Sequence, residues 1–330
     1  MQYIIHHNDD DGRCAASIIY NEICMMSGID MKKENFFEYT HGGPIPDIDV
    51  TKLTDNDVVY IVDLALDDVI YGIIKKIRES NSNVKIVHID HHKTTCSYLI
   101  ERENDVMNTV HRFYRMGLSA SMLCWVYCSM TEEEREHNIQ GAPDIFDFTE
   151  GYSHVGFNIG KSNERDIRIP MVVRFVNDWD VWNHEIHGSK AFHFGFGIVN
   201  DKHPMNKLWS DLLYAYNDHS LVEKYIIPGE AIVQYQTAEY EHMLKHAFEY
   251  TLAGVKMLCL NASGSSLVFG DKIKEYPAVC LFQYHGDKGL WHYSLYSSDE
   301  GADVSDICKK LGGGGHAHAA GFQSAEYIFI

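Results

Sequence analysis

The sequence predicts an α/β protein: an N-terminal, mostly parallel, doubly wound sheet, a helical connector, and a smaller C-terminal α+β domain. Short β-branched runs alternate with helical patterns through the first hundred residues, as in β-α-β units with right-handed crossovers. From Thr251 onward, strand-like runs instead follow one another directly. The chain has 330 residues, of which 45% are hydrophobic and 12% aromatic, which is enough for two domains with cores of their own.

The clearest predicted strand is the apolar run from Val84 to Ile89. It is short, rich in β-branched residues and preceded by the turn-forming residues 81–83, so we expect a buried parallel strand. The run ends in Asp90-His91-His92. One carboxylate and two imidazoles at the carboxyl end of a parallel strand suit a divalent transition metal. A strand that simply ends in polar residues is the alternative.

Two earlier strands end in the same kind of residue. Tyr3-Ile4-Ile5 leads into the acidic loop His6–Gly12, and a helix is predicted after it over Arg13–Met26. Val58–Val62 leads into Asp63, and an apolar helical stripe follows. Phe36–Tyr39 is predicted as a further strand. Three strands that deliver carboxylates or imidazoles to one sheet edge favour a metal site over solvated loop charge.

The segments after residue 115 are less regular. Ser119–Tyr127 is predicted as a helix with Ser119 as its N-cap, which would serve either core packing or phosphate binding near Arg115. Residues 131–165 show no sustained periodicity, which fits either an insertion over a cleft or a surface segment. The apolar run 172–177 precedes Asp178-Trp179-Asp180-Val181-Trp182, whose tryptophans would be either core residues or stacking platforms for a base.

The C-terminal half divides into a connector and a strand-rich domain. We expect domains at 1–187 and 251–330, with a connector over 188–250 that is interrupted at Pro228-Gly229 and continues as a helix over Glu230–Tyr250. The predicted strands are Val255–Leu260, Ala278–Tyr284 and Leu290–Tyr296, and a short helix spans Val304–Leu311. The four glycines that follow allow backbone N–H groups to approach an anion, although a flexible linker is the alternative.

Charge and cysteine usage limit the class of protein. The 28 basic and 47 acidic residues give a net charge of -19, which argues against a long duplex nucleic acid as partner and favours short phosphorylated substrates. The eight cysteines include no C-x-x-C pair, so we expect reduced thiols. No run approaches the roughly 20 apolar residues of a membrane span, and no secretory leader is recognisable. A cytoplasmic protein without a membrane partner is expected.

Five motifs, in this order, resemble those of one known family. They are His7-x-Asp9-x-Asp11-Gly12, Asp63, Asp90-His91-His92, Asp178-Trp179-Asp180 and the glycine-rich stretch Gly312–Phe322. The chain resembles the DHH phosphoesterases that carry a C-terminal DHH-associated domain, a group that includes RecJ-type exonucleases. The first motif and Ser119–Tyr127 are most similar to the short nano-RNase or oligoribonuclease type.

The resemblance implies a site with two divalent metal ions, with manganese preferred and magnesium or cobalt as alternatives. The implied ligands are His7, Asp9, Asp11, Asp63, His91 and Asp178, with Asp63 bridging the ions and Asp180 held in reserve. Asp90 would orient His91, and His92 would contact phosphate or act as general acid, which makes Asp63, Asp90 and His92 the expected catalytic residues. The implied substrate contacts are His316, Gly313, Gly314, Gly315, Ser119 and Arg115.

The predicted function is a manganese-dependent phosphodiesterase that converts short single-stranded oligonucleotides to nucleoside monophosphates. A cyclic or linear dinucleotide phosphodiesterase, a phosphatase of 3′,5′-bisphosphorylated nucleotides and a longer-range single-strand exonuclease remain open, although the negative charge argues against the last. A non-catalytic nucleotide-binding regulator or sponge is the alternative from another class. The oligomeric state stays open, with a homodimer as one option.

Overall fold

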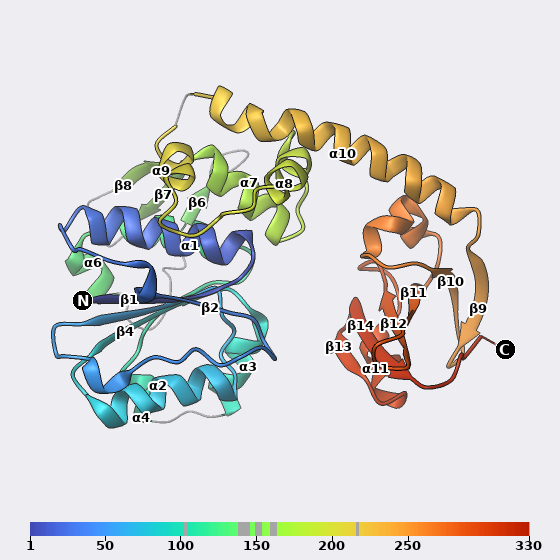
Figure 1. The fold of residues 1–330 in the computed structure, drawn as a ribbon, viewed down its shortest axis with the longest axis horizontal. Coiled ribbons are helices and arrows are strands. Elements are labelled where there is room, and N and C mark those ends of the chain that lie inside the picture. Colours follow the sequence, from blue (N-terminus) through green and yellow to red (C-terminus); the bar gives the residue numbers. More distant parts are fainter. Residues whose placement is uncertain (102–104, 138–145, 149–153, 159–163, 216–217, 330) are drawn as a thin grey trace. The chain divides into compact units, whose positions relative to one another are not determined.

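The computed structural model contains two compact units, Met1–Ile232 and Val233–Ile330 (Figure 1). It describes residues 1–101, 105–137, 146–148, 154–158, 164–215 and 218–329. The division falls inside helix α10, Ser220–Leu244, which belongs to the segment predicted to connect the domains. No helix among the described residues is long and apolar enough to cross a membrane.

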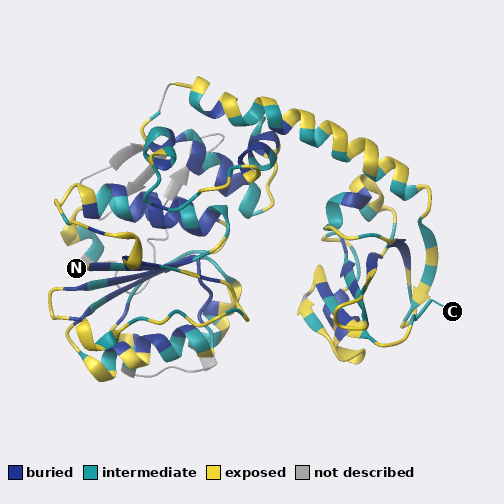
Figure 2. Ribbon diagram, in the orientation of Figure 1, coloured by how far each residue is buried: buried dark blue, intermediate teal, exposed yellow. Residues whose placement is uncertain are grey.

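The first unit is built on a five-stranded sheet in which all neighbours are parallel, as the sequence predicts. The strand order is β2-β1-β3-β4-β5, and the strands are β1 (Gln2–His7), β2 (Phe36–Tyr39), β3 (Val58–Val62), β4 (Lys85–Asp90) and β5 (His111–Tyr114). The central strands are buried on both faces, which explains their continuous apolar sequence (Figure 2). Strand β5 is not predicted by the sequence pattern, because it is an edge strand whose only fully apolar residue is Phe113.

Helices cover both faces of this sheet and create two separate cores. Helix α1 (Asp10–Ile19), which continues as a π-helical stretch over Tyr20–Met25, packs with α5 (Ala120–Ser129) on one face. Helix α2 (Asp68–Ser80) covers the other face, with α3 (Lys93–Glu101) and α4 (Asp105–Asn108) on the same side (Figure 1). The predicted doubly wound arrangement is therefore confirmed.

Segment 131–165 contains ordered elements although its sequence is not periodic. Helix α6 spans Glu132–His137, and a small antiparallel sheet is formed by β6 (Phe146–Phe148), β7 (His154–Asn158) and β8 (Glu164–Arg168). The remaining residues of this segment, 138–145, 149–153 and 159–163, lie outside the described residues. The first unit also contains the helices α7 (Met171–Asp180), α8 (Ser189–Gly197) and α9 (Lys207–Leu213).

Helix α10 does not stop at Pro228-Gly229, so the predicted interruption there is wrong. The reason is a close crossing between α10 and α8. A Cβ atom added to Gly229 would lie 1.7 Å from the carbonyl oxygen of Ala191, and one added to Gly195 would lie 1.8 Å from that of Tyr225. The two glycines therefore bring the helix backbones into contact, and the helix tolerates Pro228 in this packed setting.

The second unit contains a six-stranded sheet with the order β13-β14-β12-β11-β10-β9. Its strands are β9 (Phe248–Leu252), β10 (Val255–Asn261), β11 (Ala278–His285), β12 (Leu290–Tyr296), β13 (Gly314–His316) and β14 (Ala319–Ser324). Helix α11 spans Val304–Lys310. The three predicted strands and the predicted helix are present, but the predicted extension of the preceding helix to Tyr250 is wrong. Phe248, Tyr250 and Leu252 face the core in the period of two that defines a strand.

Candidate metal centre

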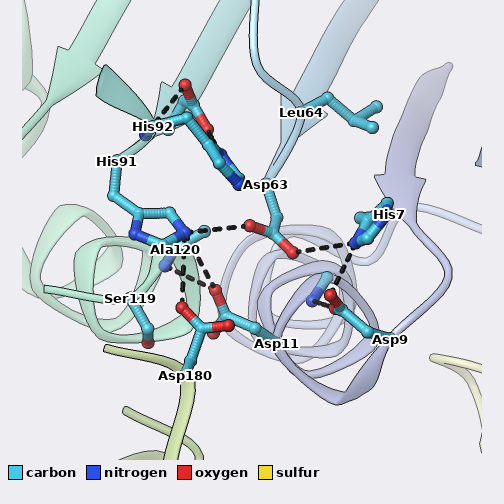
Figure 3. A network of polar contacts seen from close by, with 12 residues as sticks. His7, Asp9, Asp11, Asp63, Leu64, His91, His92, Ser119, Ala120 and Asp180 are labelled. Carbon is cyan, nitrogen blue, oxygen red and sulfur yellow. Dashed lines mark hydrogen bonds and ion pairs between the residues drawn. The ribbon is translucent and has the colours of Figure 1, made fainter. Parts of the chain in front are cut away.

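Three neighbouring strands, β1, β3 and β4, deliver polar side chains to one edge of the sheet, as the sequence predicts. His7 ends β1, Asp63 follows β3, and His91 follows β4. Figure 3 shows Asp63 between the two imidazoles, with Asp11 and Asp180 below His91. The predicted ligands therefore lie close together, except that Asp180 and not Asp178 joins the cluster.

Asp63 lies at the centre of this cluster. Its Oδ1 is 3.3 Å from Nε2 of His91, and its Oδ2 is 3.7 Å from Nδ1 of His7. The side chain is buried, and no hydrogen bond within the described part of the chain reaches Oδ2. The backbone has a φ of 57°, which is uncommon for any residue other than glycine, while its N–H donates to the carbonyl of Ile89. A strained residue with an unpaired buried oxygen suits a metal ligand.

The possible ligand atoms fall into groups of three that lie within 4.8 Å of one another. The groups are His7, Asp9 and Asp63; Asp11, His91 and Asp180; and Asp63, His91 and His92. The first two groups share no residue, and the third joins Asp63 of the first group to His91 of the second. Mixed carboxylate and imidazole donors suit manganese and similar divalent metals better than calcium.

The turn between β1 and α1 fixes the first group. Nδ1 of His7 lies 2.6 Å from Oδ2 of Asp9, while the other oxygen of Asp9 accepts the N–H of Gly12 at 2.9 Å and caps α1. Burial acts to raise the pKa of Asp9, but the contacts with His7 and the hydrogen bond from Gly12 together outweigh it and lower the pKa. A Cβ atom at Gly12 would lie 2.4 Å from the carbonyl oxygen of His7, so this turn requires glycine.

The second group depends on α5. Asp11 accepts the N–H groups of Ala120 at 2.7 Å and Ser121 at 2.9 Å, so its carboxylate occupies the helix N-terminus that we expected to hold a substrate phosphate. Ser119 is the N-cap, as predicted, and its fully buried hydroxyl accepts the N–H of Met122. Ser119 therefore caps the helix whose first N–H groups hold Asp11, and its predicted substrate contact stays a prediction.

Asp180, and not Asp178, faces the cluster. The two residues lie on α7, where residues two apart point about 200° away from each other. The fully buried carboxylate of Asp178 accepts the N–H groups of Glu185 and Ile186 and the hydroxyl of Ser189. By contrast, Oδ2 of Asp180 lies 3.3 Å from Nε2 of His91 and has no hydrogen-bond partner among the described residues. The preference for Asp178 as a ligand must be reversed.

Asp90 orients His92, and not His91 as we expected. Its Oδ1 lies 2.7 Å from Nδ1 of His92, and its Oδ2 accepts the hydroxyl of Thr95. Thr95 in turn accepts the N–H of Leu66 at 2.8 Å, which ties α3 to the loop after β3. No local sequence pattern predicts a role for Thr95, because only these contacts with Asp90 and Leu66 make it part of the site.

The ionisation of these groups follows from burial and from their neighbours. Burial acts to raise the pKa of Asp90, but the contacts with His92, the nearby His88 and the hydrogen bond from Thr95 together outweigh it and lower the pKa to about 2. Burial acts to lower the pKa of His92, but the hydrogen bond to Asp90 and the charges of Asp90, Asp11 and Asp9 together outweigh it and raise that pKa. Burial lowers the pKa of His91, which favours the neutral imidazole that a metal requires.

Two carboxyl groups respond to the crowding of negative charge. Burial and the nearby carboxylates, Asp11 and Asp9 foremost, raise the pKa of both Asp63 and Asp180 well above the usual value. Divalent cations would offset this repulsion and would fill the unpaired oxygens of both residues. The donor set therefore fits metal ions at this place.

The neighbouring residues His6 and Asp10 point away from the cluster. Nδ1 of the buried His6 lies 2.8 Å from the carbonyl oxygen of His7, and Asp10 pairs with Lys202. Arg115 is half-buried, and its backbone N–H donates to the carbonyl of Asp90 at 3.3 Å. Its position next to the site is consistent with the predicted substrate contact, which stays a prediction.

The glycine-rich stretch of the second unit lines a pocket of about 450 Å³. The lining residues are His292, Gly312, Gly313, Gly314, Gly321, Phe322 and Gln323. Gly315 pairs with Ala320 across β13 and β14 and does not line this pocket. The side chain of His316 lies outside the described parts of the chain, so its predicted phosphate contact stays a prediction.

Comparisons with known proteins give one family match and several similar folds. Residues 267–327 match the DHHA1 domain. An uncharacterized protein of Acanthamoeba polyphaga mimivirus is 26% identical over 165 residues, which cover 47% of this chain and only 37% of that relative.

Two solved structures align over nearly the whole chain. The DHH domain of a protein that is assigned to a family of ribosomal proteins has a TM-score of 0.51 at 15% identity, and the alignment covers 97% of this chain and 82% of that one. The pGpG-specific phosphodiesterase PggH of Vibrio cholerae has a TM-score of 0.47 at 12% identity, with coverage of 98% and 93%. The matched DHHA1 domain covers the glycine-rich motif, and the chain shares its fold with a DHH domain.

Proposed function

We propose that this protein is a two-metal, manganese-dependent phosphodiesterase that hydrolyses short single-stranded oligonucleotides to nucleoside monophosphates. The proposal rests on the position of Asp63, whose two oxygens face ligand groups on opposite sides and whose Oδ2 has no hydrogen bond within the described residues. One carboxylate shared in this way is suited to bridging two cations.

The proposed ligands for one ion are His7, Asp9 and Asp63, and those for the other are Asp11, His91, Asp180 and the shared Asp63. Bound ions would lower the pKa of a water to produce hydroxide and would neutralise the phosphate oxygens. The chain itself excludes solvent from the bridging carboxylate and holds each ligand through its neighbours, as Ala120 and Ser121 hold Asp11.

His92 is the proposed general acid that protonates the leaving oxygen. Its side chain is 41% exposed and therefore accessible to a substrate, while its partner Asp90 is buried. Because Asp90 raises the pKa of His92, the imidazole keeps its proton closer to neutral pH than a free histidine would.

Asp90→Asn is expected to lower kcat by about 10²-fold, within the range of general acid catalysis, and to move the alkaline limb of the pH profile to lower pH. A raised pKa means that His92 is protonated below it and loses its proton as the pH rises through it. Loss of the Asp90 charge lowers that pKa, so activity disappears at a lower pH. The measurement is kcat from pH 5 to 10, with the exposed Asp49→Asn as control. If the alkaline limb of the kcat profile stays at the same pH in Asp90→Asn, His92 is not the general acid.

The size of the substrate follows from charge. A net charge of -19 disfavours a long polyanion and favours a short phosphorylated substrate. The glycine pocket of the second unit is the proposed place for a phosphate, although the N–H groups of Gly312 and Gly313 already donate to the carbonyls of Lys309 and Cys308. We assign Gly313 and Gly314 of the pocket wall, together with Gly315, His316 and Arg115, to the substrate as proposed contacts. Ser119 is left out because its side chain is fully buried.

The test is product analysis with 5′-phosphorylated RNAs from two to about 24 nucleotides, a span around the 4–16 nucleotide sites of single-strand binders. Cyclic dinucleotides and 3′,5′-bisphosphorylated adenosine are tested in parallel, with manganese, with magnesium and with chelator. We expect manganese-dependent release of monophosphates, fastest from the shortest RNAs. Faster turnover of a cyclic dinucleotide or of the bisphosphate would replace the proposed substrate, and tight retention without turnover would favour a binding protein.

A further inference from the structure

Beside the metal centre lies a group of stacked aromatic rings, which we call the aromatic shelf: Trp179, Trp182, His184, His193 and Phe194. The ring of Trp179 stacks on that of His193 at 4.0 Å with 14° between the planes, and on that of Trp182 at 6.1 Å with 27°. His184 and Phe194 contact Trp179 edge to face. The shelf joins α7 to α8, which pack against each other (Figure 1).

Trp182, the outer ring of the shelf, is exposed to solvent and has an unfavourable backbone conformation. Trp182 is 55% exposed, although a tryptophan of structural value is normally largely buried. Its φ is 57°, and that of His184 is 52°, which are unfavourable values for bulky residues. A strained backbone that displays an aromatic ring to solvent is typical of a binding element rather than of a core.

The loop that displays these rings is held rigidly. The carbonyl of Asp178 accepts the N–H groups of Asn183 and His184, and its carboxylate accepts those of Glu185 and Ile186. The N–H of Trp182 donates to the carbonyl of Trp179. Asp178 therefore fixes the loop in the conformation that exposes Trp182, so little ordering would be needed on binding.

The shelf is linked to the two chain segments that carry proposed metal ligands. Trp179 precedes Asp180, whose Oδ2 lies 3.3 Å from His91. On the other side, Nδ1 of His193 lies 3.9 Å from Oδ2 of Asp10, the residue between Asp9 and Asp11. The rings are thus anchored within one residue of proposed metal ligands on both α7 and α1.

We propose that the aromatic shelf stacks a nucleobase of the nucleotide whose phosphodiester bond lies at the metal centre. This inference rests on the proposed function and specifies its substrate class. Flat rings stack on the face of any base, whereas inorganic polyphosphate or pyrophosphate offers no ring. The shelf therefore selects nucleotides over inorganic phosphate chains, and Trp182, the most exposed ring, is the residue on which a base would lie.

The experiment compares Trp182→Ala and Trp182→Phe on a 5′-phosphorylated diadenylate and on its two analogues that lack one base each. We expect Trp182→Ala to raise KM for the complete dinucleotide by about 10- to 100-fold with kcat within a few-fold of wild type, and Trp182→Phe to restore most of the loss. Removal of the stacked base and removal of the Trp182 ring should not be additive. Tyr235→Ala, which removes another exposed ring on α10, is the matched control.

The proposed stacking would be overturned if KM were unchanged in Trp182→Ala. It would also be overturned if, for both analogues, the effects of removing the base and of removing the Trp182 ring were additive. A change of oligomeric state in Trp182→Ala would also overturn it, because the ring would then contact another copy of the chain. If the wild-type protein hydrolyses no nucleotide, the proposed function fails. Quenching of tryptophan fluorescence by the diadenylate then tests separately whether a base stacks on the aromatic shelf. Quenching lost in Trp182→Ala supports stacking, while equal quenching in both proteins, or none in either, rejects it.

Discussion

Asp63→Asn is expected to reduce hydrolysis of a dinucleotide by at least about 10³-fold and to leave the protein with at most one firmly bound manganese ion. An amide has no charge with which to hold two cations, and the loss of Lewis-acid stabilisation amounts to several kcal/mol in the transition state. The measurements are kcat/KM on a 5′-phosphorylated dinucleotide and the number of manganese ions bound at equilibrium.

The matched control is Asp57→Asn. Asp57 is buried at the other end of the same strand, where it pairs with the N-terminal amine and accepts the N–H of Thr54. This variant should lose some stability but keep both ions and full turnover. Two bound ions and normal turnover in Asp63→Asn would disprove the bridging role, whatever the control does.

Asp180→Asn and Asp178→Ala are expected to have opposite effects. Without a metal, the charge of Asp180 is unfavourable because burial and neighbouring carboxylates oppose its ionisation, so Asp180→Asn should unfold no earlier than wild type. It should lose one ion and at least about 10²-fold in activity. Asp178→Ala leaves the N–H groups of Glu185 and Ile186 and the hydroxyl of Ser189 without their acceptor. This should cost about 3 kcal/mol and lower Tm by roughly 6–12 °C.

Thermal unfolding without metal and ion counting with metal separate the two cases. The folded Asp178→Ala protein should still bind two ions, whereas Asp180→Asn should not. An active Asp180→Asn protein, together with an Asp178→Ala protein of normal Tm that has lost an ion, would restore Asp178 as the ligand.

The sheet and most of the proposed ligands could be predicted because the sequence shows where each strand ends. β3 and β4 are short apolar runs that stop at Asp63 and Asp90, and the edge they share follows from parallel pairing. The choice between Asp178 and Asp180 could not be predicted. The preceding run contains Val172, Val173 and Val176, which fits a strand or a buried helix equally well, and only the helix sets the two carboxylates on opposite sides.

Other features depend on contacts between distant residues, which no local pattern shows. Asp11 and Ala120 are separated by 109 positions, yet their hydrogen bond decides that the α5 N-terminus holds a carboxylate. The contact of Gly195 with the α10 backbone likewise overrides the local tendency of Pro228-Gly229 to end a helix. Thr95 became part of the site only through its bonds to Asp90 and Leu66.

The raised pKa values of Asp63 and Asp180 mean that protons and metal ions compete for the same oxygens. Acidification protonates these carboxyl groups and releases cations, whereas a rise in pH frees the oxygens and tightens metal binding. The metal content of a purified sample therefore depends on the pH and on the chelators used during purification. A preparation that was purified in acidic buffer and assayed without added manganese would look like a binding protein, even though its catalytic residues were intact.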